Sequence, residues 1–340
     1  MILCRYYKNP TGKFKGLPAT TKVWVVTVNK KIGKKVSHGL QFLLEWEDMK
    51  LYDPKNWLKE RVELDLLKKL PDQIALVDAT LPIPSEIKAH QIVGITQNLE
   101  AKELIDLAVS TGIRFILQNS RTKFVREVAL AAELMTVPTR YLGGPEARVL
   151  SHFNTEKSVS FALRHSKARD ETMNLVVQFI KKIPGGELIK DSVRLLADEM
   201  FTNALYNAPA NKSGKHITSH LPRTAAIELG PDCQARMTLS FDEKRLFLGC
   251  EDPFGSLDEH KFIVGLHSKY RGDELTPVNM GPGGAGIGCR MLLDRSTEFY
   301  VVCEKGLRTF FGCTLPLGQS AREFEGTFKN LYIDFFNEGT

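Results

Sequence analysis

Several features that would define a structural class are missing from this sequence of 340 residues. None of its six cysteines, at positions 4, 233, 250, 289, 303 and 313, belongs to a CxxC pair, so neither a zinc ribbon nor a disulfide framework is predicted. No apolar run approaches the roughly 18 residues that a membrane helix requires. The start of the chain also lacks the apolar core of a signal peptide. We therefore expect a reduced, cytoplasmic protein without a membrane partner.

The rest of the composition is ordinary. Hydrophobic residues make up 43% of the chain and charged residues 25%, which argues against global disorder, a collagen-like repeat or a coiled-coil rod. No internal repeat or low-complexity segment is visible. At about 150 residues per domain, the length predicts about two domains.

Acidic residues are absent from the first 44 positions, although the net charge of the whole chain is only +6. The bases of this segment are Arg5, Lys8, Lys13, Lys15, Lys22, Lys30, Lys31, Lys34 and Lys35. Such a block could attract nucleic acid or an acidic partner. We interpret residues 1–21 instead as a solvated basic arm that is partly loose, and we do not expect a nucleic-acid partner.

Residues 22–136 alternate strand-like and helix-like stretches, a pattern typical of a doubly wound parallel sheet with helices on both faces. The expected strands are 22–29, 73–78, 91–96 and 113–118, and the expected helices are 53–70, 101–110 and 122–135. Residues 137–155 carry Pro138, Gly143, Gly144 and Pro145 with little periodicity, and we interpret them as a linker.

The second half groups its elements differently, with strands in runs and helices in runs. This grouping predicts an α+β two-layer sandwich over residues 156–318. The expected strands are 159–164, 223–229, 235–241, 246–251, 299–303 and 308–315. The expected helices are 170–182, 188–206 and one that begins at Cys289. The aromatic-rich tail, residues 319–340, is expected to be helical.

Three polar residues in the expected helix 188–206 are spaced by four positions. Glu199, Asn203 and Asn207 therefore lie on one helix face. A carboxylate can accept a proton, and an amide oxygen can ligate Mg²⁺. A solvated polar face is the simpler reading of this stripe taken alone.

Two further segments add to this stripe. Asp252 ends a predicted strand and is followed by Pro253 and Gly255, so it could accept a hydrogen bond from an adenine amino group or simply stabilise a turn. Residues 281–288, Gly-Pro-Gly-Gly-Ala-Gly-Ile-Gly, precede the helix expected at Cys289. Glycines before a helix allow backbone N–H groups to approach phosphate. No Walker motif is present, because no Gly-Lys-Ser/Thr follows.

In combination, the polar helix, the strand ending in Asp252 and the glycine loop resemble the nucleotide-binding boxes of the GHKL (histidine kinase/Hsp90-like) ATPase superfamily. The closest likeness is to the anti-sigma-factor serine kinases, and it covers about residues 156–318. The resemblance implies the GHKL (Bergerat) ATP-binding fold, ATP or ADP with Mg²⁺ as cofactors, and serine/threonine kinase activity. It also implies a regulatory protein partner of the sigma-factor or anti-sigma-antagonist type. Members often dimerise, so a homodimer is a further expectation.

The resemblance assigns roles to individual residues. It implies Glu199 as general base, Asn203 as Mg²⁺ ligand, Asn207 as a nucleotide contact, Asp252 as adenine acceptor with Gly255 in the adjacent turn, and Gly284, Gly286 and Gly288 as the phosphate loop. It places Thr309 near adenine, and Lys269 and Arg271 in a lid, residues 258–283, as contacts of the terminal phosphates.

The sequence also departs from the family pattern. Phe254 and Ser256 stand where relatives have glycine after the strand, which predicts a bulkier pocket floor. Asn207-Ala208 stands where many relatives have His-Gly. Phosphoryl transfer is therefore less firmly predicted than nucleotide binding, and a nucleotide-switched binding module without transfer activity is the alternative.

The first domain resembles a degenerate response-regulator receiver. Asp78 ends a strand as the phospho-acceptor of receivers does, and Thr96 ends the next strand. The paired acids that receivers need for Mg²⁺ are missing after the strand at 22–29, and Gln118 stands in place of lysine. We therefore expect a pseudo-receiver that does not accept phosphate; another doubly wound sheet, with Asp78 in a turn, is the alternative.

A histidine kinase is a third possibility, because His152 and His165 precede the polar helix. Such an enzyme needs a helical hairpin that carries the phosphorylated histidine. Only one short helix separates His165 from the polar helix, so we expect both histidines to lie at the surface.

Overall fold

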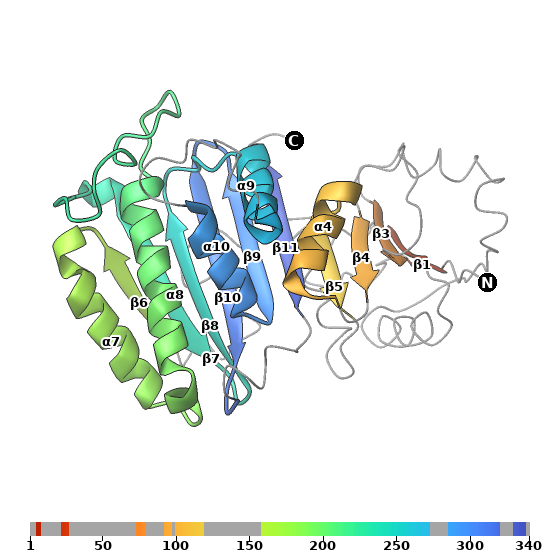
Figure 1. Ribbon diagram of the computed structural model, residues 1–340, viewed down its shortest axis with the longest axis horizontal. Helices are drawn as coiled ribbons and strands as arrows, with labels where there is room; N and C mark the ends of the chain where they lie inside the picture. The colour runs from red at the N-terminus through yellow and green to blue at the C-terminus, as the bar shows by residue number, and fades with distance from the viewer. Residues whose placement is uncertain are drawn as a thin grey trace. The chain divides into compact units, whose positions relative to one another are not determined.

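Short strands rich in Val and Ile build the sheet of the first of two units into which the chain divides (Figure 1). The computed structural model describes residues 5–7, 22–26, 73–78, 92–96, 99–118, 158–272, 285–319 and 329–337. The first unit is Met1–Leu99 with Asp106–Pro138, and the second is Glu100–Ile105 with Thr139–Thr340.

The sheet of the first unit follows the order β1-β2-β3-β4-β5. Its strands are β1 (Arg5–Tyr7), β2 (Lys22–Val26), β3 (Gln73–Asp78), β4 (Ile92–Thr96) and β5 (Phe115–Gln118). Strands β2 to β5 are parallel, as the sequence pattern predicts, whereas β1 is antiparallel to β2. Residues 5–7 of the expected basic arm thus form backbone pairs with β2.

Helix α4 (Ala101–Thr111) joins β4 to β5, in agreement with the helix expected at 101–110. Every residue of β4 and β5 is buried, as is usual for strands of a parallel sheet. The expected helices 53–70 and 122–135 and the linker 137–155 lie outside the described residues.

The strands of the second unit follow the order β11-β9-β10-β8-β7-β6. Its strands are β6 (Ser158–Leu163), β7 (Ala235–Phe241), β8 (Arg245–Asp252), β9 (Glu298–Glu304), β10 (Arg308–Pro316) and β11 (Asn330–Phe336). All neighbours are antiparallel except β11 and β9, which are parallel.

One face of this sheet is covered by a row of helices in the order α7, α8, α10, α9 (Figure 1). Their bounds are α7 (Arg169–Lys181), α8 (Lys190–Thr202), α9 (Glu259–Arg271) and α10 (Ala285–Asp294). Short turns are η5 (Ser166–Ala168), η6 (Gly186–Leu188), η7 (Asn203–Asn207) and η8 (Pro231–Cys233). Strands and helices thus form a mixed α/β arrangement.

The structure corrects three expectations in the second unit. The tail is not helical at 330–336, because these residues form β11 and pair with β9. Residues 223–229 form no strand; their backbone contributes only one isolated bridge, between His165 and Glu228. Helix α10 begins at Ala285 rather than at Cys289, so Gly286 and Gly288 are helical.

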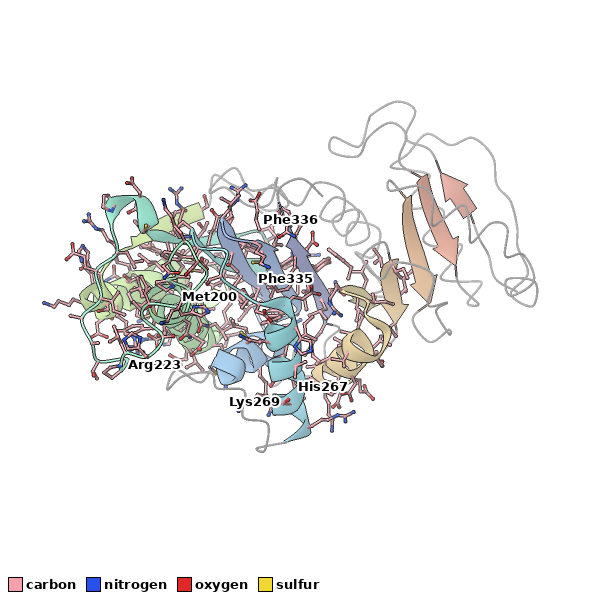
Figure 2. The ribbon with its side chains drawn as sticks, turned by 90° about the horizontal axis from the view of Figure 1, so that it is seen from above. Met200, Arg223, His267, Lys269, Phe335 and Phe336 are labelled. Atoms are coloured by element: carbon pink, nitrogen blue, oxygen red, sulfur yellow. The ribbon has the colours of Figure 1, made fainter. Side chains whose placement is uncertain are left out.

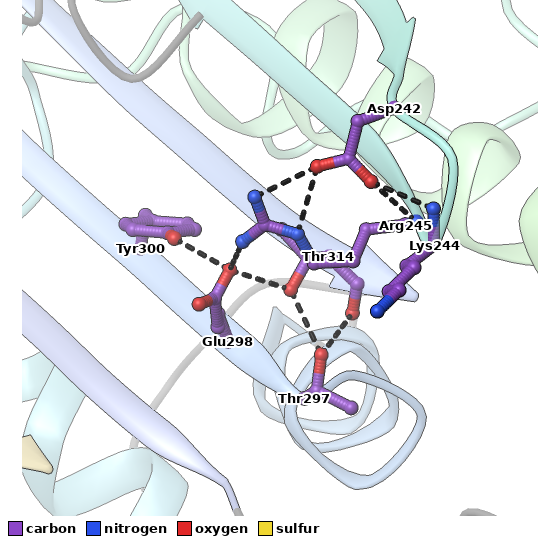
Figure 3. Close-up of polar contacts among 7 residues, drawn as sticks. All are labelled: Asp242, Lys244, Arg245, Thr297, Glu298, Tyr300 and Thr314. Atoms are coloured by element: carbon purple, nitrogen blue, oxygen red, sulfur yellow. Dashed lines mark hydrogen bonds and ion pairs between the residues drawn. The ribbon is translucent and has the colours of Figure 1, made fainter. Parts of the chain in front are cut away.

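A buried polar network fixes the end of the sheet at which β8 begins (Figure 3). Glu298 Oε2 accepts hydrogen bonds from Tyr300 Oη and Thr314 Oγ1, both at 2.9 Å, and lies 3.4 Å from Arg245 Nη1. Arg245 also donates to Asp242 Oδ2, from Nη2 at 2.9 Å. Because each charge has a partner of opposite sign, burial here leaves no lone charge. The other end of β8 is Asp252.

Candidate functional site

The predicted polar stripe is present on α8 and the turn that follows it. Asn207 Nδ2 donates to Asn203 Oδ1 at 2.7 Å, and the Asn203 side chain acts to lower the pKa of Glu199. The turn η7 is a π-helical turn, in which the amide of Ala208 donates to the carbonyl of Asn203 at 2.8 Å. Single π turns within helices frequently occur at functional sites, because the extra residue changes the direction of the side chains that follow.

Glu199 lies directly against the glycine-rich segment. A Cβ placed on Gly288 would come within 1.9 Å of Glu199 Oε1, so only a glycine fits there without displacement. Helices α8 and α10 are in contact, in agreement with this close approach. The residue of the glycine-rich segment that contacts the Glu199 carboxylate is therefore Gly288, which lies within α10.

The environment of Glu199 disfavours its charged form. Its side chain is 11% exposed, and Oε1 is buried without a hydrogen-bond partner. Burial raises the pKa of Glu199, while Arg223, with Nη1 3.9 Å from Oε2, opposes the rise. Arg169 exerts less influence, since it is held by Asp198 through two bonds of 2.5 and 2.6 Å. A carboxyl group with a raised pKa and an unpartnered oxygen is suited to accept a proton.

Asp252 and Thr309 form the second part of the site. They are register partners across β8 and β10, and the Thr309 hydroxyl favours the charged form of the Asp252 carboxyl group and so acts to lower its pKa. Oδ1 also accepts from the amide of Phe254 at 3.0 Å, so the turn role that the sequence allowed is real. Burial raises the pKa of Asp252 to about 7, against the lowering effect of these two residues.

Gly255 holds the turn after Asp252 in a conformation that requires glycine. Its φ is +53°, and an added Cβ would come within 2.1 Å of the Glu304 carbonyl oxygen and 2.5 Å of the Leu307 amide nitrogen. The carbonyl of Gly255 accepts from the Gly306 amide at 2.9 Å. The turn is thereby locked onto the hairpin between β9 and β10.

Ser256 joins the two parts of the site. Its hydroxyl donates to the carbonyl of Ala208 at 2.7 Å, at the end of η7. The residue that departs from the family's glycine pattern thus connects the turn after Asp252 to the polar helix. Strand β8 and η7 are in contact as well.

Lys269 and Arg271 lie in the part of the expected lid that the structure describes. Residues 259–271 form the regular helix α9, and both side chains are exposed near its end. Arg290 of α10 fixes this end, since its Nη1 donates to the Lys269 carbonyl at 2.8 Å. Residues 273–284, which include Gly284, lie outside the described residues, and the side-chain surroundings of Gly286 are not described either.

Arg223 and Tyr206 are site residues that the sequence analysis missed. The Tyr206 hydroxyl is 2.9 Å from the carbonyl oxygen of Arg223 and 2.8 Å from that of Ala225, and it holds this loop beside η7. Arg223 lies 24 positions beyond Glu199 in a stretch expected to be a strand, so no spacing rule connects the two residues. Figure 2 shows Arg223 on this loop, apart from Lys269 of α9.

In the first unit, the residues that were compared with a receiver have structural roles. Gln118 is completely buried, and its side chain donates to the Leu99 carbonyl at 2.6 Å and accepts from the Leu99 amide at 3.1 Å. Thr96 is 2% exposed. The side chain of Asp78 lies outside the described part of the chain.

His165 is a half-exposed residue beside Glu228, with Nδ1 3.8 Å from the Glu228 carboxylate, in agreement with the expected surface position. His152 is outside the described residues.

Comparison with protein-family models and with curated protein sequences finds no match for this chain. Within the described ranges, no helix is long and apolar enough to cross a membrane, and no group of three or more His, Cys, Asp and Glu side chains is arranged to hold a metal ion.

Proposed function

We propose that the second unit binds ATP or ADP in the manner of the GHKL superfamily. The observation that carries this proposal is the contact between Gly288 and Glu199. It brings the glycine-rich segment to the acid-and-amide helix, while Ser256, in the turn after Asp252, is hydrogen-bonded to Ala208 at the end of the same helix. These are the three segments that the resemblance requires to meet.

The arrangement also suggests an orientation for the nucleotide. Phosphate groups are favoured at the N-terminus of α10, where the helix dipole and unpaired N–H groups attract anions. Glu199 lies against Gly288 in the first turns of α10, at this phosphate end. Asp252, with Thr309 beside it, then lies at the base end, where an adenine amino group would donate to its carboxylate.

The residues present fit a magnesium ion that is held mainly by phosphate oxygens. Mg²⁺ in phosphoryl-transfer sites takes one or two protein oxygens and otherwise substrate phosphates and water. Asn203 Oδ1 is such an oxygen, and the unpartnered Oε1 of Glu199 lies on the same helix face. When bound, the ion would neutralise charge on the phosphates.

We further propose that the protein is a serine/threonine kinase of the anti-sigma type. Glu199 would accept the proton of a partner's serine hydroxyl as that oxygen forms its bond to the terminal phosphorus, and ADP would leave. The raised pKa of Glu199 favours proton uptake. The first unit would act as a receiver-like sensor that takes no phosphate, since Gln118 is committed to Leu99.

A nucleotide-switched binding module is the second candidate. It is favoured by Arg223, because a guanidinium 3.9 Å from Glu199 opposes the rise in the pKa of the carboxyl group and makes it a weaker base. Binding would then change partner affinity without transfer.

The two candidates are separated by Glu199→Gln, which keeps the size of the side chain and removes the base. With labelled ATP and a serine-bearing partner, the kinase proposal expects phosphate on serine with the wild type and a loss of at least about a hundredfold with Glu199→Gln. Glu187→Gln, at an exposed acid of the same unit, is the control. Nucleotide binding without any transfer by the wild type would leave the binding module as the function.

A further inference from the structure

Arg223 occupies a position that the proposed nucleotide site leaves unexplained. It belongs to a long loop, 208–234, that joins η7 to β7, and its guanidinium reaches back to Glu199. Between Asn207 and Ile227 this loop contains Lys212, Lys215 and Arg223 and no acidic residue. Arg223 is the basic residue of the loop that lies beside the carboxylate.

The backbone around Arg223 is fixed. The Tyr206 hydroxyl lies within hydrogen-bond distance of the Arg223 and Ala225 carbonyls, and Thr218 donates to the Tyr206 carbonyl at 2.9 Å from a buried position. The loop is therefore fastened to Tyr206 at Thr218 and again at Arg223 and Ala225. These hydrogen bonds place Arg223 beside Glu199, at the end of the site where Glu199 contacts Gly288.

The side chain of Arg223 is partly accessible to a ligand. It is 38% exposed, and 3.9 Å between Nη1 and Oε2 is an ionic contact longer than a hydrogen bond. A guanidinium binds phosphate oxygens with paired, charge-assisted hydrogen bonds, which are stronger than this contact. An anionic phosphoryl group beside Glu199 would therefore compete successfully for Arg223.

We propose that Arg223 is the specificity-determining residue that distinguishes ATP from ADP, by moving from Glu199 to the terminal phosphate. The move would also release Glu199 from its cation when the triphosphate is in place. This inference rests on the proposed nucleotide site. It adds a ligand role for the loop 208–234, which is not one of the three proposed nucleotide-binding segments.

The test is calorimetric titration of the full chain with Mg·ATP and with Mg·ADP. The variant is Arg223→Met, which keeps the aliphatic stem and removes the charge, and Lys215→Met on the same loop is the matched control. We expect Arg223→Met to weaken Mg·ATP at least tenfold and Mg·ADP less than twofold, and Lys215→Met to change neither. Arg223→Lys, which keeps the charge without the planar fork, should recover part of the ATP affinity.

An equal loss for both nucleotides, or an unchanged ratio of the two affinities, would overturn the role of Arg223 while the nucleotide site stood. A wild type that binds neither nucleotide would overturn both proposals together. Urea unfolding of each variant shows whether a loss of affinity comes from misfolding. If Arg223→Met is misfolded, the ratio of ATP to ADP affinity of Arg223→Lys decides whether Arg223 distinguishes the two nucleotides.

Discussion

Gly288 lies so close to the Glu199 carboxylate that a methyl group at position 288 would overlap Oε1. The contact joins α8 to α10, two helices separated by more than 80 residues of chain. It also places the base of the proposed reaction at the phosphate end of the proposed site. The predictions below start from this contact.

Gly288→Ala should displace the Glu199 side chain, because the atoms that an added Cβ would meet are its Oε1, Cδ and Cγ. Overpacking of a close contact costs about 1–3 kcal/mol, and we expect a loss of this order in the free energy of unfolding, together with weaker Mg·ATP binding. Urea unfolding and calorimetry measure the two effects. Gly230→Ala is the control, because a Cβ at Gly230 meets no atom within 4 Å. Equal stability of the two variants would contradict the contact.

Asp252→Asn should change how stability depends on pH. The pKa of Asp252 is raised from 3.8 to about 7 by burial, so between these values the folded protein keeps a proton that the unfolded chain releases. Wild-type stability therefore falls as pH rises through this window, whereas Asn has no proton to lose. The stability of Asp252→Asn relative to the wild type should increase between pH 5 and pH 8 by more than about 1 kcal/mol, since one pKa unit corresponds to about 1.4 kcal/mol.

Urea midpoints at several pH values measure this difference. Asp334, with its pKa also raised to about 7 by burial, contributes a slope of the same sign in both proteins and cancels in the comparison. A constant difference across the range would show that Asp252 ionises normally in the folded protein.

Glu298→Ala should destabilise the second unit through Arg245. The substitution removes one of the acids paired with a guanidinium that is 11% exposed, and breaking a buried ion pair from one side costs about 3–5 kcal/mol. Glu298→Gln keeps the acceptor oxygen for Tyr300 and Thr314 and should cost less. Chemical unfolding of both variants is the measurement, and equal losses would show that the charge is unimportant.

Gly255→Ala should be more harmful than an alanine at an ordinary turn glycine. The residue has a left-handed φ and also faces the Glu304 carbonyl, so both backbone strain and a steric clash result. Gly272 has a similar φ of +74° but no atom within 4 Å of an added Cβ. The difference in unfolding free energy between Gly255→Ala and Gly272→Ala measures the cost of the clash with the Glu304 carbonyl. Equal losses would mean that the hairpin between β9 and β10 shifts to accommodate the added methyl group.

Sequence periodicity predicted most of the described elements because their burial follows a regular pattern. The strand 73–78 and the strand 235–241 have the expected bounds, and α8 places Glu199 and Asn203 on one face. The spacing of apolar residues could not identify β11, because an aromatic-rich stretch is compatible with either a helix or a strand. These residues form a strand because they pair with β9. The glycines at 286 and 288 suggested a loop, but Gly288 lies inside a helix, where its close approach to Glu199 accounts for glycine.

Contacts between distant loops were beyond the sequence altogether. Arg223 reaches Glu199 because Tyr206 holds the loop, and neither spacing nor composition indicates that bond. The same holds for Ser256, which departs from a family pattern and finds its partner in Ala208. Local sequence preferences determine helices and strands, whereas such contacts depend on the tertiary fold.

The central claim is that the second unit binds a purine nucleotide, with its phosphates at the N-terminus of α10 beside Glu199 and its base at Asp252. Titration of the full chain with Mg·ATP, for the wild type and for Asp252→Ala, tests it most directly. The account predicts saturable binding by the wild type and at least tenfold weaker binding by a folded Asp252→Ala variant. Absence of binding to the wild type, or equal affinity of the two proteins, would contradict it.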